Sequence, residues 1–276
     1  MKNDIKKVAA IHDISGIGRC SLTATISVLS VMGLQCCPLP TAVLSNQTGF
    51  KSYSFLDFTD YMPEYIDYWE KLDVEFDTIY SGFLGSEAQI DIVIDFIKRF
   101  RRPQTLIIID PVFGDNGVVY PAFSQSISGH MKRLISYADI VLPNLTEAAF
   151  ITDYKGNPLL ASKEDIAEMA RKIFARGPKK VVITGCVTGD TIINYIFDFE
   201  NNETREINAE YNHCSYSGTG DIFASIVCGS LTNGEELEAA VRKASAFVEK
   251  AVKYTDGFNG CANDGIFYEK FLKELY

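Results

Sequence analysis

The sequence has no excess of positive charge, no long apolar run and no paired cysteine motif, and each absence excludes a class of protein. Its 276 residues carry a formal net charge of -10. That charge argues against a nucleic acid or an anionic membrane as partner, because both bind basic surfaces. Nowhere do about eighteen apolar residues follow one another, as a membrane-spanning helix requires. Segment 1–5 lacks the apolar core of a signal peptide, so we expect a cytoplasmic protein.

Disulfide and zinc signatures are also missing. The seven cysteines include no Cys-x-x-Cys pair, and their odd number fits a reducing compartment better than a disulfide framework. Adjacent Cys36 and Cys37 would point to opposite faces of a strand, so they are poorly placed to share a zinc ion. The three histidines lie far apart in the sequence. We interpret His12 and His213, which stand beside motifs, as pocket or loop residues rather than catalytic bases.

Short apolar runs alternate with longer amphipathic ones, which is the pattern of parallel strands joined by crossover helices. The pattern predicts strands at 8–11, 78–81, 106–109, 140–142 and 181–184, and helices at 22–32, 87–100, 163–175 and 235–253. The last two helices would follow caps at Ser162 and Asn233. Segments 191–199 and 204–211 predict a β-hairpin. Because the strands are almost wholly apolar, helices should cover both faces of an α/β sheet.

The most informative stretch is 217–224, where glycines surround Asp221 at the start of an apolar helix. Gly218 and Gly220 permit positive φ and bring bare backbone N–H groups close to a ligand. A helix start carries partial positive charge, so it can hold phosphate oxygens and keep Asp221 ionised at neutral pH. This arrangement favours phosphoryl transfer, with Asp221 accepting an alcohol proton. The alternative is an ordinary loop and helix cap.

Polar residues follow the predicted strands, where open α/β sheets bind ligands. Segment 12–18 follows the first strand, 110–117 the third, 143–147 the fourth and Gly185 the fifth. Oxygen ligands for Mg²⁺, which binds carboxylates, water and phosphate, could come from Asp110, Asp115, Asn144 and Glu147. Each of these residues alone could equally be a loop or cap residue.

Taken together, these segments resemble the ribokinase superfamily, specifically its pyridoxal and pyridoxamine kinase branch. The similar segments span nearly the whole chain in the order of that branch: 45–49, 81–85, 110–112, 143–147, 177–185 and 218–221. The Gly-Thr-Gly-Asp run at 218–221 is typical of the superfamily, whereas the segments at 45–49 and 81–85 point to vitamin B6 rather than sugars. The resemblance implies one ribokinase-like kinase domain over 1–276, a three-layer α/β/α sandwich with a mostly parallel central sheet and an antiparallel β-hairpin.

The resemblance also implies an activity: transfer of the γ-phosphoryl group of ATP to the 5′-hydroxymethyl group of pyridoxal, pyridoxamine or pyridoxine. Mg²⁺ would bridge the phosphates, and a monovalent cation such as K⁺ often lies nearby. Asp221 would be the base, while Gly218, Thr219 and Gly220 supply a backbone anion hole. The remaining roles fall on three groups: Asn144, Thr184, Gly185, Thr219 and Gly220 at ATP, Asp110, Asp115 and Glu147 at the metal, and Asp13, Ser15, Leu44, Thr48 and Phe83 at the substrate.

A homodimer is implied as well, and the hairpin at 191–211 or the apolar segment 34–39 could supply the pairing edge. We further expect the polar loop 46–51 to cover the bound substrate.

Two departures from the pyridoxal kinase pattern leave the substrate open. The segment 13–18 is shorter than in some relatives, so either Asp13 or Ser15 could meet the ring nitrogen. Position 83 is Phe where several relatives have Tyr, which removes a hydroxyl contact. A hydroxymethylpyrimidine of thiamine synthesis is therefore an alternative substrate. A ligand-binding protein without turnover is a further alternative, disfavoured because Asp221 and its anion hole are both present.

Overall fold

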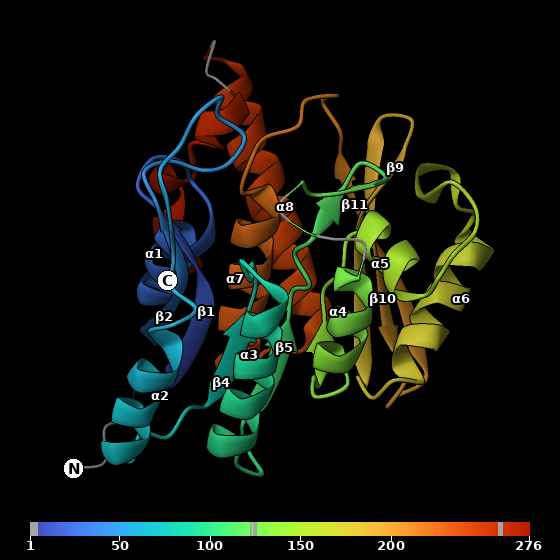
Figure 1. Cartoon of the computed structure of the whole chain (residues 1–276). Helices are drawn as coiled ribbons and strands as arrows, with labels where there is room; N and C mark the ends of the chain where they lie inside the picture. The colour runs from blue at the N-terminus through green and yellow to red at the C-terminus, as the bar shows by residue number, and fades with distance from the viewer. Residues whose placement is uncertain (1–4, 122, 124–125, 259–261) are drawn as a thin grey trace.

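A nine-stranded sheet forms the centre of the computed structural model, which describes residues 5–121, 123, 126–258 and 262–276 (Figure 1). Its strands are β1 (Lys7–Ser15), β2 (Gln35–Leu44), β3 (Phe55–Asp57), β4 (Thr78–Ser81), β5 (Leu106–Ile109), β8 (Ile140–Val141), β9 (Lys180–Thr188), β10 (Thr191–Asp198) and β11 (Glu203–Glu210). They follow the order β11-β10-β9-β8-β5-β4-β1-β2-β3. The strands from β9 to β2 are parallel, whereas β10, β11 and β3 run antiparallel to their neighbours.

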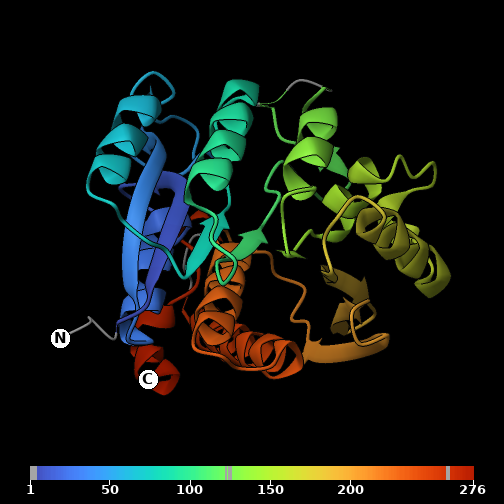
Figure 2. The ribbon, with the colours of Figure 1, turned by 90° about the horizontal axis from the view of Figure 1, so that it is seen from below.

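Helices cover both faces of this sheet, which confirms the three-layer α/β/α arrangement. The helices are α1 (Ser21–Val31), α2 (Met62–Lys71), α3 (Glu87–Phe100), α4 (Ile127–Ile135), α5 (Leu145–Ile151), α6 (Lys163–Phe174), α7 (Thr219–Thr232) and α8 (Leu237–Asp256). Helices α2 to α6 share one apolar core with the sheet, and α1, α7 and α8 share the other. Figure 2 shows the sheet between these two layers.

The two cores explain why the strands are apolar at nearly every position. Successive side chains of a strand point to opposite faces. Ala9 and Ile79 pack into the core under α2 to α6, whereas Val8 and Tyr80 pack into the core under α1, α7 and α8. Full burial of a Val, Leu or Ile side chain contributes roughly 1.5–3 kcal/mol. The two cores therefore fix where each strand lies between the helix layers and where its carboxyl end stands.

The helix caps agree with the sequence in one case and differ in the other. Ser162 caps α6 in a reciprocal capping box with Asp165. Asn233 does not cap α8 and is instead the C-terminal cap of α7, because its N–H donates to the carbonyl oxygen of Gly229 and the next N–H, that of Gly234, donates to the carbonyl oxygen of Leu231. Helix α8 begins only at Leu237, after an N-cap at Glu236. The prediction for Asn233 was therefore wrong.

The cysteines behave as separate thiols wherever the structure describes them. Cys20, Cys36, Cys37, Cys186, Cys214 and Cys228 are all free. Cys36 packs against the core of α1, α7 and α8, and Cys37 against the core on the other face, as alternation along a strand predicts. Cys261 and residues 1–4 lie outside the described residues. Within the described ranges no helix is both long and apolar enough to cross a membrane.

Candidate active site

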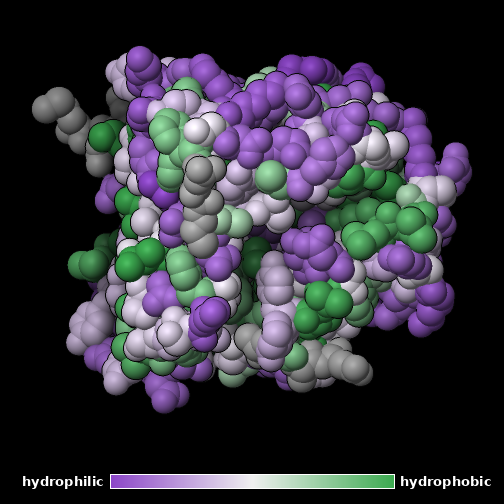
Figure 3. Space-filling view, turned by 90° about the horizontal axis from the view of Figure 1, so that it is seen from above, coloured by the Kyte–Doolittle hydropathy of each residue, from purple (hydrophilic) through white to green (hydrophobic). Residues whose placement is uncertain are grey.

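The carboxyl ends of the parallel strands lie along the upper edge of the sheet in Figure 1. Figure 3 looks down on this edge, and the face is hollowed near its centre. The loops after β1 and β2 meet here: the Gly16 N–H donates to the Leu44 carbonyl (2.9 Å) and the Gln47 N–H to the Ile17 carbonyl (3.0 Å). An open cavity of about 650 Å³ lies beside these loops and is lined by Ile17, Asn46, Gly49, Phe50, Lys51, Ser52 and Asn263.

The start of α7 reaches the same edge and exposes its backbone. Gly218 is the N-cap of α7 with φ +79°, and a Cβ there would overlap the carbonyl oxygen of Arg19. Only glycine fits both that backbone conformation and that contact. Gly220 is exposed, and apart from its chain neighbours and the backbone of its own helix no described atom lies within 4 Å of the place where its Cβ would stand. The N–H groups at this helix start are therefore open to an anion.

The carboxyl group of Asp221 lies in the first turn of α7. It accepts a hydrogen bond from the backbone N–H of Ser21. Burial raises the pKa of Asp221 to about 7, and the nearby charge of Asp13 acts in the same direction. The partial positive charge of the helix start alone predicted that Asp221 is ionised at neutral pH. Burial has the opposite effect and brings the pKa of Asp221 close to neutral pH.

Asp13 and Ser15 lie on β1 itself and not in a loop after it. The strand extends four residues beyond the predicted end at 11, with a register shift between His12 and Ile14. Both residues are buried, and the Ser15 hydroxyl donates to the Asp13 carboxylate at 3.0 Å. The Ser21 side chain also hydrogen-bonds to Asp13, while burial raises the Asp13 pKa. Ser21 thus contacts both carboxylates and brings Asp13 beside Asp221.

Glu147 and Asn144 form a reciprocal capping box at the start of α5. One Glu147 oxygen accepts from the Asn144 N–H (2.8 Å) and the other from the Phe113 N–H (3.2 Å). The Asn144 amide donates to the Gly114 carbonyl at 2.8 Å. These bonds hold the segment after β5 against α5, on the edge where the metal and the nucleotide are predicted to bind.

Asp110 and Glu147 are both buried, and burial together with the nearby Asp110 charge raises the pKa of Glu147. Burial and the charge of Asp221 raise the Asp110 pKa well above its usual range. Two neighbouring buried carboxylates favour a cation between them and phosphate oxygens.

The hydrogen bonds of the Asp115 carboxylate do not involve Asp110 or Glu147. It stands on β6 (Gly114–Asp115), and its carboxylate accepts from the backbone N–H (2.7 Å) and side-chain amide (3.1 Å) of Asn116. The described residues bring no three His, Cys, Asp or Glu side chains together as a metal cage. Mg²⁺ does not require one, because it binds through one or two carboxylates plus water and phosphate.

Thr184 and Gly185 lie next to Asn144 on the same edge. Thr184 forms an isolated parallel bridge with Asn144, and its N–H donates to the Pro143 carbonyl at 2.9 Å. Gly185 has φ +71°, and its N–H donates to the Asn194 side chain at 3.1 Å. The structure thus brings together three residues that the resemblance assigned to ATP.

The residues assigned to the substrate differ in exposure. Leu44 is buried at the end of β2, and Phe83 is half-buried after β4, where its ring lies 5.6 Å from that of Phe123. Thr48 is exposed in the loop that lines the 650 Å³ cavity on one side. Leu44 and Phe83 therefore offer apolar surface, whereas Thr48 lies in an exposed loop.

The two histidines beside motifs are not catalytic bases in this geometry. His12 is fully buried, and the ring of Tyr80 lies 4.4 Å away, edge-on. Burial lowers the His12 pKa to about 3, so the ring is neutral. His213 is exposed in a loop and pairs with Asp190 at 2.8 Å.

Three residues that lie beside the predicted ones could not be found from the sequence: Ser21, Arg19 and Asn263. Ser21 adopts a positive φ of 48° just inside α1, which a sequence pattern does not reveal for a non-glycine residue. Arg19 and Asn263 matter through contacts between segments more than 200 residues apart. No local signal marks such contacts.

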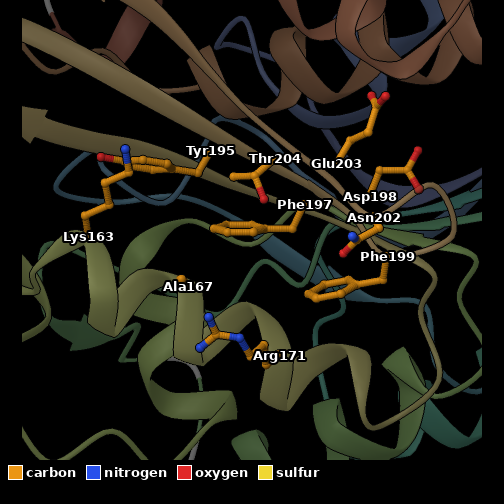
Figure 4. A pocket seen from close by; sticks show the side chains of 10 residues that line it. All are labelled: Lys163, Ala167, Arg171, Tyr195, Phe197, Asp198, Phe199, Asn202, Glu203 and Thr204. Carbon is orange, nitrogen blue, oxygen red and sulfur yellow. The ribbon is translucent and has the colours of Figure 1, made fainter.

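A second cavity, of about 220 Å³, lies between α6 and the β10–β11 hairpin (Figure 4). Tyr195, Phe197 and Phe199 line it from the hairpin, and Ala167 and Arg171 line it from α6. None of the predicted site residues borders this cavity.

Comparison with known proteins assigns the chain to a family. Residues 20–264 match the family model described as phosphomethylpyrimidine kinase. The chain belongs to the phosphomethylpyrimidine kinase family. A thiamine biosynthetic bifunctional enzyme of Arabidopsis thaliana is 28% identical over 262 residues, which are 91% of this chain and 48% of that enzyme. Pyridoxine kinase of Bacillus subtilis is 30% identical over 185 residues, which are 64% of each protein.

A solved structure extends the family relationship to the whole fold. A Bacteroides thetaiotaomicron protein assigned to the phosphomethylpyrimidine kinases, crystallised with pyridoxal, is 43% identical with a TM-score of 0.95. The match covers 99% of this chain and 96% of that protein. These matches confirm the resemblance to the pyridoxal kinase branch and its ribokinase-like fold.

Proposed function

We propose that this family member transfers the γ-phosphoryl group of ATP to the 5′-hydroxymethyl group of pyridoxal, pyridoxamine or pyridoxine. One observation carries the proposal: the Asp221 carboxyl lies one residue after the exposed backbone of Gly220, at a helix start that glycine opens to an anion. A base beside an anion-binding helix start suits transfer of a phosphoryl group to an alcohol. The 43% identity to a protein crystallised with pyridoxal supports the choice of a pyridine substrate.

In this mechanism each residue acts on charge or position. An unactivated alcohol is too weak an acid to ionise beforehand, so Asp221 takes its proton as the new P–O bond forms, a contribution of roughly 10²- to 10⁴-fold. The backbone N–H groups of Gly218, Thr219 and Gly220 stabilise the charge on the transferred group. Leu44 and Phe83 would flank the ring, with Asp13, Ser15 or Thr48 giving polar contacts.

Asp110 and Glu147 are the carboxylates that would hold Mg²⁺, and Asn144, Thr184 and Gly185 would contact the nucleotide. Bound Mg²⁺ would neutralise charge on the phosphate oxygens. The buried pair of carboxylates fits this role because Mg²⁺ binds through one or two carboxylates and takes its other ligands from water and phosphate. We extend the proposal to the whole chain acting as one kinase unit and as a homodimer; use of Asp115 and of K⁺ stays a prediction.

A hydroxymethylpyrimidine is the second candidate substrate. The family description, and the thiamine biosynthetic enzyme that matches 91% of this chain, favour it. Both substrates are flat heteroaromatic alcohols, so the same Asp221 chemistry serves either.

A mass-spectrometric product assay with Mg-ATP tests the proposal, with the three B6 vitamers and hydroxymethylpyrimidine offered in parallel. We expect 5′-phosphates of the vitamers. Reaction of the pyrimidine alone would retain the kinase chemistry and reject the pyridine substrate. Binding of ATP without any product would favour a ligand-binding protein.

A further inference from the structure

Arg19 stands where three segments from distant parts of the chain meet. Its Nε donates to the Glu269 carboxylate at 2.5 Å, and its guanidinium donates to the Asp264 carbonyl at 3.1 Å. The guanidinium carbon lies 4.6 Å from the centre of the Phe267 ring. The side chain is therefore held at three points by the C-terminal segment 262–269. Such a planar fork, stacked and bonded at once, has little freedom to move.

The backbone of Arg19 in turn abuts the helix start of α7. Its carbonyl oxygen occupies the space that a Cβ on Gly218 would need. On the other side, a Cβ on Gly265 would lie 2.9 Å from both the Arg19 Cβ and the Ser217 carbonyl oxygen. The Ser217 N–H also donates to the Ala262 carbonyl at 3.1 Å. Close packing of this kind transmits small displacements, because it leaves no free volume.

Two residues after Arg19, the backbone at Ser21 holds the carboxyl group of Asp221. The Ser21 N–H donates to Asp221. A shift of the backbone at Arg19 therefore moves the supports of the anion hole and of Asp221 together.

We propose that Arg19 is a positioning residue for phosphoryl transfer: anchored by the C-terminal segment 262–269, it fixes Gly218 and Asp221 relative to each other. Arg19 touches neither substrate nor phosphate in this role. The inference rests on the proposed function, because it concerns the same helix start and the same base.

The test compares Arg19→Ala with Arg99→Ala. Arg99 is a matched control, since it also bonds two acceptors, Asp67 and Glu70, at 2.7 Å each, and its side chain is 22% exposed against 29% for Arg19. It joins α2 to α3, away from the site. We expect Arg19→Ala to lower kcat at least about tenfold while KM for ATP stays within about twofold, because misplaced reacting groups cost rate more than binding. Arg99→Ala should keep kcat and lower only the Tm.

Hydrogen–deuterium exchange provides a second measurement that needs no substrate. The bonded amides on either side of the helix start, Ser217 to the Ala262 carbonyl and Ile222 to the Gly218 carbonyl, should exchange faster in Arg19→Ala than in the wild type and in Arg99→Ala. Arg19→Lys, which keeps the charge but loses the fork, should lie between wild type and Arg19→Ala and serves if the alanine variant does not fold.

Two results would overturn the inference: a kcat of Arg19→Ala near that of the wild type with unchanged exchange at Ser217 and Ile222, or an equal loss of kcat in Arg99→Ala. If the wild type phosphorylates neither ring type, the proposed function fails, and the exchange experiment alone still decides whether Arg19 holds this helix start.

Discussion

Replacing Asp221 by Asn should abolish most activity and, above neutral pH, stabilise the fold. Asn keeps the size of the side chain and one acceptor oxygen but removes the base and its charge. We expect kcat to fall by roughly 10²- to 10⁴-fold, the usual contribution of a general base. ATP binding should change little, because the anion hole is built from backbone N–H groups that the substitution leaves in place.

The gain in stability follows from the pKa. Asp221 titrates at about 7 in the folded protein against a usual value of 3.8. Between these values the folded state binds more protons than the unfolded state, so this group's contribution to stability falls as pH rises from about 4 to about 7. The full difference corresponds to at most about 4 kcal/mol. Asn carries no such penalty, so the variant should exceed the wild type in free energy of unfolding at pH 8.5 and differ little at low pH.

Urea unfolding at pH 5 and pH 8.5, beside kcat measured over the same range, checks both parts. In the wild type, kcat should rise through pH 7 as Asp221 ionises, and the residual activity of the variant should lack that limb. Asp153→Asn is the control of opposite sign: its hydrogen bond to Lys132 lowers the Asp153 pKa, so the change should lower stability slightly at pH 7, by less than about 1 kcal/mol. Near-wild-type turnover in Asp221→Asn would show that Asp221 is not the base, and no gain in stability at pH 8.5 would show that burial does not raise its pKa.

Three further predictions concern the packing around the site and the loop beside it. Gly218→Ala should lower kcat by about 10²-fold or more, because φ +79° and the Arg19 carbonyl oxygen leave no room for a Cβ; unchanged kcat would show that the helix start tolerates displacement. Gly82→Ala should destabilise the fold, measured by urea unfolding, since its Cβ would overlap the His12 ring. Adding His12→Ala should restore part of that loss, and a strictly additive double mutant would argue against the contact. Finally, ATP plus substrate should protect the loop 46–51 from proteolysis; an unchanged cleavage rate would mean that the loop does not cover the site.

Much of the fold could be predicted because its signals are local. The apolar runs at 106–109 and 181–184 mark buried strands whatever their partners, and Ser162 followed by Asp165 marks a helix start. Asn233 was predicted at the wrong helix end because a cap-forming residue suits either end of a helix. Only the packing of α7 decides which end it caps. The extension of β1 to Ser15 depends on pairing with β2, which no pattern within β1 contains.

The site was predictable in residue types and less so in its energetics. Glycines beside Asp221 indicate an anion-binding helix start from sequence alone. The rise in the Asp221 pKa depends on burial and on Asp13, which the fold brings close from the other end of the chain. The contacts of Arg19 could not be predicted for the same reason, because its partners Asp264 and Glu269 lie about 250 residues away in the sequence.

Phosphoryl transfer with Asp221 as the base is tested by a single-turnover experiment with γ-labelled Mg-ATP and pyridoxal, run in parallel with the wild type and Asp221→Asn. With the wild type we expect the label in a 5′-phosphate of pyridoxal, and with the variant we expect this product to form more slowly by at least about 10²-fold. Equal labelling by both proteins, or label that appears only as free phosphate, would contradict it.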